Sequence, residues 1–210
     1  SGCLTVNRAG ERMAPLAELA ATGVRIFTDD GNGVQDPLLM RRIMEYSLDL
    51  NVVLAQHCEV SRLTSGAVMH EGCCSSHLGL PGWPALAEEL MVYRDIELAR
   101  ITGARVHFLH LSTVRSVELV RAAKRDGLRV TTEAAPHHFT LTDELLATFD
   151  ALYKVNPLAT SAIPVLIGEI PGVPAEPVAW TYTNRFGAAC STPRWGMSMT
   201  LPRPVSSDCC

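Results

Sequence analysis

The chain has 210 residues, which is enough for one α/β domain with a sizeable core. A hydrophobic content of 47% and a charged content of 19% exclude an intrinsically disordered protein. The formal net charge of -4 gives no electrostatic basis for binding nucleic acid or an anionic membrane, and no apolar run approaches the ~20 residues of a transmembrane helix.

The predicted elements alternate between helices and strands along the chain. Helices are expected at about 16–20, 37–46, 84–102, 112–125 and 142–149, and strands at about 24–29, 51–57, 104–111 and 128–134. Pro37 is typical of a first helical position, Gly103 of a helix end, and Ser112 of a helix N-cap. Residues 58–84 contain four glycines and two prolines, so a long loop is expected there.

Strands that alternate with helices predict right-handed βαβ units around a parallel sheet. We therefore expect an α/β fold that is a partial TIM (β/α)8 barrel, with about four βα units within residues 1–156. A doubly wound sheet is the competing architecture. It is disfavoured because no glycine-rich G-x-G-x-x-G loop follows any of the predicted strands.

The composition changes after Asn156. Eight of the 13 prolines fall within residues 157–210, and no helical or alternating hydrophobic period persists there. We leave residues 157–210 as an unassigned proline-rich tail, for which a frameshift is one explanation. The chain also starts without methionine, and we expect it to be cut from a longer protein.

Seven cysteines are present, and no C-x-x-C pair occurs among them. An odd number without paired spacing argues against a disulfide framework and against a cysteine zinc finger. We therefore expect a reducing, cytoplasmic location. Cys58 directly follows His57, so the two side chains leave opposite faces of the strand, and we expect Cys58 to pack in the core.

Three predicted strands end in side chains that bind metals. Asp29 and Asp30 end the first strand, and since strand side chains alternate, only one of them can face a site. His57 ends the second strand and His110 the third. The carboxyl ends of parallel strands meet at one edge, so Asp30, His57 and His110 are predicted to form a zinc site. The alternative is that both histidines are core residues bonded to backbone.

Other polar residues near these strand ends have open roles. His107 lies on the opposite strand face from His110 and is expected to be structural. His137 and His138 follow a proline beyond a strand end, which fits either a pocket rim or plain exposure. Glu59 either supports His57 or is solvated.

Several segments together resemble the class I dihydroorotases of the amidohydrolase superfamily. They occur in the family's order and spacing over about residues 4–157, roughly three-quarters of the chain. The matching segments are Phe27–Gly31, Gln56–Glu59, Leu78–Pro84 with Ala87–Glu89, Arg94–Ile96, Val106–Thr113, Pro136–His138 and Val155–Pro157.

The resemblance implies a TIM barrel with two zinc ions in each complete site. In that family Asp30 matches the carboxylate that bridges both metals, His57 and His110 match ligands of one zinc, and Asn156 matches a substrate-binding residue. The implied activity is the reversible cyclisation of N-carbamoyl-aspartate to dihydroorotate in pyrimidine biosynthesis. The implied partner is this small-molecule substrate, and a homo-oligomer is left open.

The sequence also departs from the family. The first-strand His-x-His pair and the Thr-Asp-His-Ala-Pro-His segment with the catalytic aspartate are absent, so no catalytic residue is assigned. We expect a central fragment that is inactive by itself. Two alternatives are a hydantoinase-like or allantoinase-like cyclic amidohydrolase, and a catalytically dead barrel homologue that serves as a structural partner.

Overall fold

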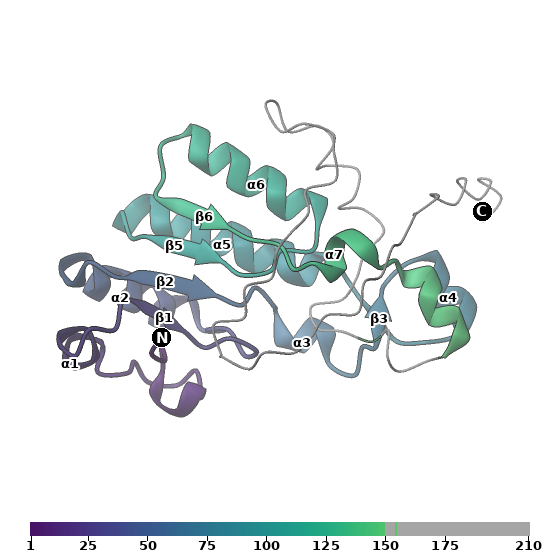
Figure 1. Ribbon diagram of the computed structural model, residues 1–210, viewed down its shortest axis with the longest axis horizontal. Helices are drawn as coiled ribbons and strands as arrows, with labels where there is room; N and C mark the ends of the chain where they lie inside the picture. Colours follow the sequence, from purple (N-terminus) through teal and green to yellow (C-terminus); the bar gives the residue numbers. More distant parts are fainter. Residues whose placement is uncertain (150–153, 155–210) are drawn as a thin grey trace, which may run out of the picture. The chain divides into compact units, whose positions relative to one another are not determined.

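The computed structural model describes residues 1–149 and 154 (Figure 1). Four strands form one parallel sheet in the order β1-β2-β5-β6. They are β1 Ile26–Thr28, β2 Val53–Gln56, β5 Val106–Phe108 and β6 Val130–Thr132. The strand order never reverses, as it would at the switch point of a doubly wound sheet. The expected parallel α/β architecture is therefore confirmed.

A further parallel segment lies on the outer edge of β1. Gly2 forms a parallel bridge with Phe27, in which Gly2 N–H donates to the carbonyl of Ile26 at 2.9 Å. Thr28 N–H donates in turn to the carbonyl of Gly2 at 2.8 Å. The sheet thus continues beyond β1 in the same direction, as the staves of a barrel do.

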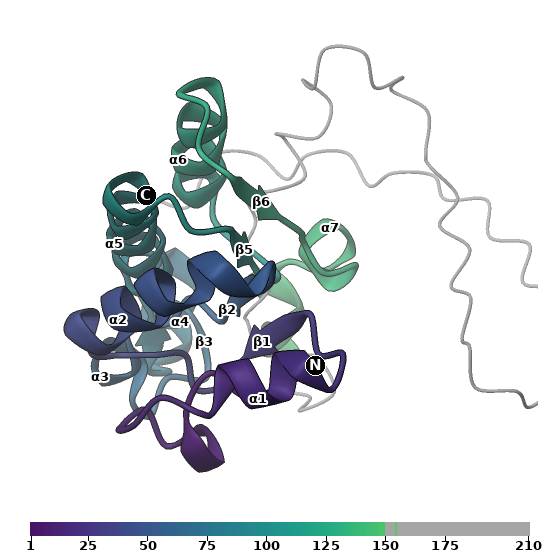
Figure 2. The same cartoon turned by 90° about the vertical axis from the view of Figure 1, so that its left-hand side faces the viewer.

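Three long helices cover the same face of this sheet, as Figure 2 shows. They are α2 Pro37–Ser47, α5 Leu86–Thr102 and α6 Val114–Arg125, and a short helix α1 Leu16–Ala21 precedes β1. Asp36 caps α2 by accepting the N–H of Leu39 at 2.6 Å. Each long helix follows a strand in sequence, so the chain is built of βα units.

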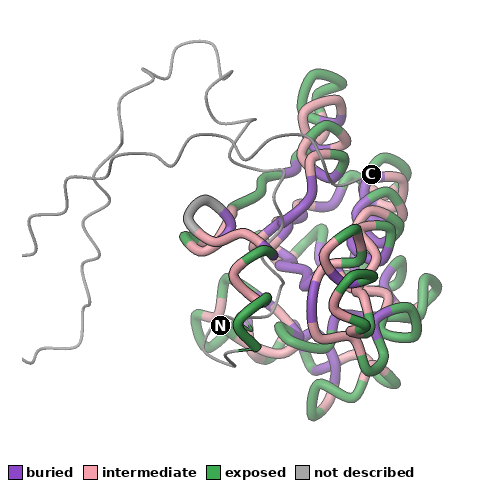
Figure 3. Tube along the Cα trace, turned by 90° about the vertical axis from the view of Figure 1, so that its right-hand side faces the viewer, coloured by how far each residue is buried: buried purple, intermediate pink, exposed green. Residues whose placement is uncertain are grey.

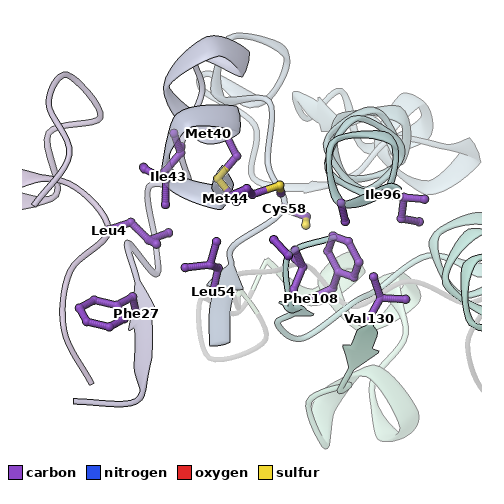
Figure 4. Packing of buried hydrophobic residues seen from close by; sticks show 14 of the residues in the cluster. Leu4, Phe27, Met40, Ile43, Met44, Leu54, Cys58, Ile96, Phe108 and Val130 are labelled. Carbon is purple, nitrogen blue, oxygen red and sulfur yellow. The ribbon is translucent and has the colours of Figure 1, made fainter. Parts of the chain in front are cut away.

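The core lies between the sheet and these helices (Figure 4). Phe27, Leu54, Val106 and Val130 are in register across the four strands, and all are buried. Helix α2 contributes Met40, Ile43 and Met44, and α5 contributes Ile96. Cys58 belongs to the same cluster, as the sequence predicted. In Figure 3 the buried residues lie towards the interior, and the outer turns of the helical coils are exposed.

The expectation of a loop over residues 58–84 was wrong. The segment holds two short helices, α3 Ser61–Thr64 and α4 Cys73–Leu78, and a two-stranded parallel sheet of β3 Met69–His70 and β4 Gly82–Trp83. Elements of two to six residues show no period in the sequence. Their glycines and prolines therefore looked like a loop.

Smaller differences occur at helix ends. Thr113, not Ser112, caps α6 by accepting the N–H of Ser116 at 3.2 Å. The helix expected near 142–149 is a 3-10 helix over Asp143–Thr148, preceded by α7 His137–Thr140. The other 3-10 helices are Val6–Arg8 and Leu48–Leu50.

Two sequence predictions lie outside the described residues, namely Asn156 and the unassigned segment 157–210. Within the described part, no helix combines the length and the apolar character that crossing a membrane requires.

Candidate metal site

The two aspartates at the end of β1 have different surroundings. Asp29 is 1% exposed and accepts the backbone N–H groups of Leu4 at 2.8 Å and of Thr5 at 3.1 Å, as well as the Thr5 hydroxyl. It therefore ties the N-terminal segment to β1. The Asp30 side chain is 56% exposed and faces two histidines from other strands.

Asp30, His57 and His110 come together at the carboxyl edge of the sheet, after β1, β2 and β5. Asp30 Oδ1 lies 3.1 Å from His110 Nε2 and 3.4 Å from His57 Nδ1, and the two nitrogens are 3.3 Å apart. An ion held tetrahedrally at about 2.0 Å separates its ligand atoms by about 3.3 Å. One triangle of atoms thus has the edge lengths of a zinc coordination sphere.

Glu59 determines which nitrogen of His57 can bind a metal. The His57 side chain is 3% exposed, and its Nε2–H donates to Glu59 Oε2 at 2.8 Å. An ionised carboxylate only accepts, so the proton sits on Nε2 and the lone pair of Nδ1 faces Asp30 and His110. The open question about Glu59 is therefore answered, since it supports His57.

The charge states of both carboxylates suit this arrangement. Burial by itself would raise the pKa of Glu59, but hydrogen bonds from His57 and Thr64 hold it below its ordinary value. Burial likewise opposes ionisation of Asp30, yet the hydrogen bond and charge of His110, with smaller contributions from His57 and Gly31, lower its pKa. The Asp30 carboxylate is therefore ionised at neutral pH.

The loop after β1 packs tightly against His57. Gly33 has φ +60°, and a Cβ built on it would lie 2.4 Å from the backbone oxygen of His57. The Gln56 side chain accepts the N–H of Val34 at 3.2 Å and donates to Asp95 at 2.9 Å. Polar contacts of Gln56 therefore hold the chain on the N-terminal side of this histidine.

His110 reaches the cluster through an unusual backbone conformation. Its φ is +35°, in the left-handed region that residues with a Cβ seldom adopt. The strand ends at Phe108. The Leu109 N–H donates to the backbone carbonyl of Gln56 at 3.1 Å, and the Leu111 N–H donates to the backbone carbonyl of Glu133 at 2.9 Å. Strand alternation therefore does not govern His110, and the sequence carried no signal for this turn.

The remaining histidines near the sheet do not join the cluster. His107 pairs with Thr131 Oγ1 at 2.8 Å and lies 3.4 Å from a Glu133 oxygen. His138 is fully buried, with its ring centroid 4.2 Å from that of His137, so plain exposure was wrong for His138.

A cavity of about 260 Å³ lies beside the cluster. Its lining includes Gly31, which follows Asp30 directly, and Glu59, which bonds His57. Arg8 contributes a guanidinium to the same cavity. The cavity is therefore lined by sequence neighbours and a hydrogen-bond partner of the cluster, and not by Asp30, His57 or His110 themselves.

Solved structures share this fold. The chain aligns with an L-hydantoinase (dihydropyrimidinase) from Arthrobacter aurescens with a TM-score of 0.59 at 18% identity, over 73% of this chain and 37% of that one. It also aligns with a D-hydantoinase (dihydropyrimidinase) from Thermus sp. with a TM-score of 0.59 at 22% identity, over 80% and 38% of the two chains. The architecture is therefore part of a TIM barrel, as predicted.

Sequence comparison is more specific. The family model described as "Dihydro-orotase-like" matches residues 2–116, and the chain belongs to this family. Over 158 residues it is 51% identical to the dihydroorotases of Leifsonia xyli subsp. xyli and Streptomyces coelicolor, and 48% identical to that of Mycobacterium tuberculosis. These matches cover 74% of this chain but only 36% of the Leifsonia protein and 37% of the other two.

Proposed function

We propose that this chain is part of a zinc-dependent dihydroorotase, which interconverts N-carbamoyl-aspartate and dihydroorotate. The observation that carries the proposal is the triangle of Asp30 Oδ1, His57 Nδ1 and His110 Nε2 with edges of 3.1 to 3.4 Å. Family membership and the relatives named dihydroorotase support the choice of substrate.

In this proposal each residue of the cluster has one task. Asp30, His57 and His110 hold a zinc ion, and the exposure of Asp30 leaves its carboxylate accessible to a second zinc. Zinc in such a site polarises an amide carbonyl and lowers the pKa of water. Glu59 keeps the proton on His57 Nε2, so that Nδ1 remains a ligand. Asn156 is proposed to contact substrate.

Zinc binding is tested by calorimetric titration of the 210-residue chain. We expect binding by the wild type and by a His107→Ala control, whose histidine lies outside the cluster, and at least about tenfold weaker binding by His110→Ala. Equal affinities in all three would contradict the site. We expect no turnover of dihydroorotate by this chain, since the aspartate motif of the family is absent from its sequence.

The substrate is tested with a chimera. The matching 158 residues replace their counterpart in the Streptomyces coelicolor dihydroorotase, and hydrolysis of dihydroorotate and of hydantoin is compared. Preference for dihydroorotate is the expected result. Preference for hydantoin would favour a hydantoinase-like enzyme, and a zinc-loaded but inactive chimera would favour a catalytically dead homologue.

We also propose that the protein works in a reducing compartment of the cell. No disulfide joins the cysteines of the described residues, which are Cys3, Cys58, Cys73 and Cys74. This supports a cytoplasmic enzyme.

A further inference from the structure

Helix α5 carries a buried carboxylate whose partners lie on the strand-end loop of β5. Glu88 is 4% exposed, and it accepts the backbone N–H groups of Ser112 at 2.9 Å and of Thr113 at 3.1 Å. The hydroxyls of the same two residues lie 2.6 Å and 3.1 Å from its oxygens. Both carboxylate oxygens are thus occupied by a loop 24 residues away in sequence.

This loop directly follows His110. The backbone of His110 has φ +35°, a strained conformation for a residue with a Cβ. Such a backbone persists only where the surrounding contacts hold it in place. On its C-terminal side, those contacts are the Leu111 N–H bond to the Glu133 carbonyl and the bonds of Ser112 and Thr113 to Glu88.

The same helix holds the other histidine. Asp95 lies seven residues after Glu88, on the same side of α5, and is fully buried. It accepts from the Gln56 side chain at 2.9 Å, one residue before His57. Two buried carboxylates, two helical turns apart, therefore reach the segments of both histidines.

We propose that Glu88 is a positioning residue of the metal site, which holds the 111–113 turn and thereby the left-handed backbone of His110. The inference rests on the proposed function in that His110 is taken as a zinc ligand. Glu88 itself touches neither the ligand atoms nor a metal. It acts through the two backbone amides that it accepts.

The test compares Glu88→Gln with Glu97→Gln in the 210-residue chain. Glu97 lies on the same helix and pairs with Arg100 at the surface, so its variant controls for loss of a carboxylate from α5. A glutamine at position 88 can accept with one oxygen only, and its amide group faces donors. Three quantities are measured, namely hydrogen exchange at 111–113, the affinity for Co²⁺ from its absorption spectrum, and the imidazole resonances of His110.

In Glu88→Gln we expect exchange at residues 111–113 to rise at least about tenfold and Co²⁺ affinity to fall about 10- to 100-fold, as for other residues that orient metal ligands. The His110 resonances should move, while Glu97→Gln should match the wild type within about twofold in both rates and affinity. Faster exchange with unchanged Co²⁺ affinity and unmoved His110 resonances would reduce Glu88 to a merely structural role and overturn the proposal.

The two proposals fail in different ways. A wild-type chain that binds no Co²⁺ contradicts the metal site, and the metal-free resonances of His110 then still decide whether Glu88 positions it. If Glu88→Gln does not fold, Ser112→Ala removes one donor at 2.6 Å and keeps the amide. For Ser112→Ala we expect the Co²⁺ affinity to fall about threefold. If neither the His110 resonances nor the affinity changes in this variant, the proposal is overturned.

Discussion

Gly33→Ala offers a direct test of how tightly the loop after β1 supports His57. Gly33 has φ +60°, and an added Cβ would lie 2.4 Å from the His57 backbone oxygen, about 1 Å inside ordinary contact. Gly66 is the matched control, because it has φ +78° and a Cβ added to it would have no atom within 4 Å. The difference between the stability losses of the two variants cancels the backbone strain and leaves the cost of the contact with His57.

The expected sizes follow from these two contributions. Left-handed strain costs about 1–2 kcal/mol for alanine, and the smaller entropy of the unfolded chain returns about 0.4–1 kcal/mol. Gly66→Ala should therefore lower the free energy of unfolding by about 1 kcal/mol. Gly33→Ala should cost about 1–3 kcal/mol more, because backbone has to move as it does in an overpacked core.

Urea unfolding measures the free energies, and titration with Co²⁺ measures the metal site. We expect Gly33→Ala to weaken Co²⁺ binding at least about tenfold, since the displaced oxygen belongs to His57 itself. Gly66→Ala should leave the affinity unchanged. Equal losses of stability in both variants, with equal affinities, would refute the argument that Gly33 is required by its approach to His57.

Three further predictions concern the core and its charged groups. Phe108→Ala removes a fully buried side chain and should lower the free energy of unfolding by about 3–5 kcal/mol in urea titration. Glu59→Gln should cost about 1.5 kcal/mol at pH 7. Because folding lowers the pKa of Glu59, the stabilisation by its carboxylate is complete at neutral pH and is lost as the pH falls below about 4.5. The free energies of unfolding of the wild type and of Glu59→Gln should therefore converge at low pH. A difference that stays constant with pH would contradict this. Burial raises the pKa of Cys58, so iodoacetamide should label the partly exposed Cys3 in the native chain and Cys58 only after unfolding, as mass spectrometry can follow.

The architecture could be predicted from the sequence because it depends on local signals. Alternating strands and helices require parallel βαβ units, and Pro37 and Gly103 bound α2 and α5 where the structure has them. The convergence of Asp30, His57 and His110 follows from the same topology, since each stands at or just beyond the carboxyl end of a parallel strand.

Only the tertiary structure could decide which polar group meets which. Asp30 was predicted to face the histidines, but nothing in the sequence showed that its neighbour Asp29 is buried against the N-terminal segment. Glu88 reads in the sequence as one more charge on an apolar helix, and its partners lie 24 and 25 residues away. A buried carboxylate must find donors wherever the fold brings them, and no local pattern encodes that choice.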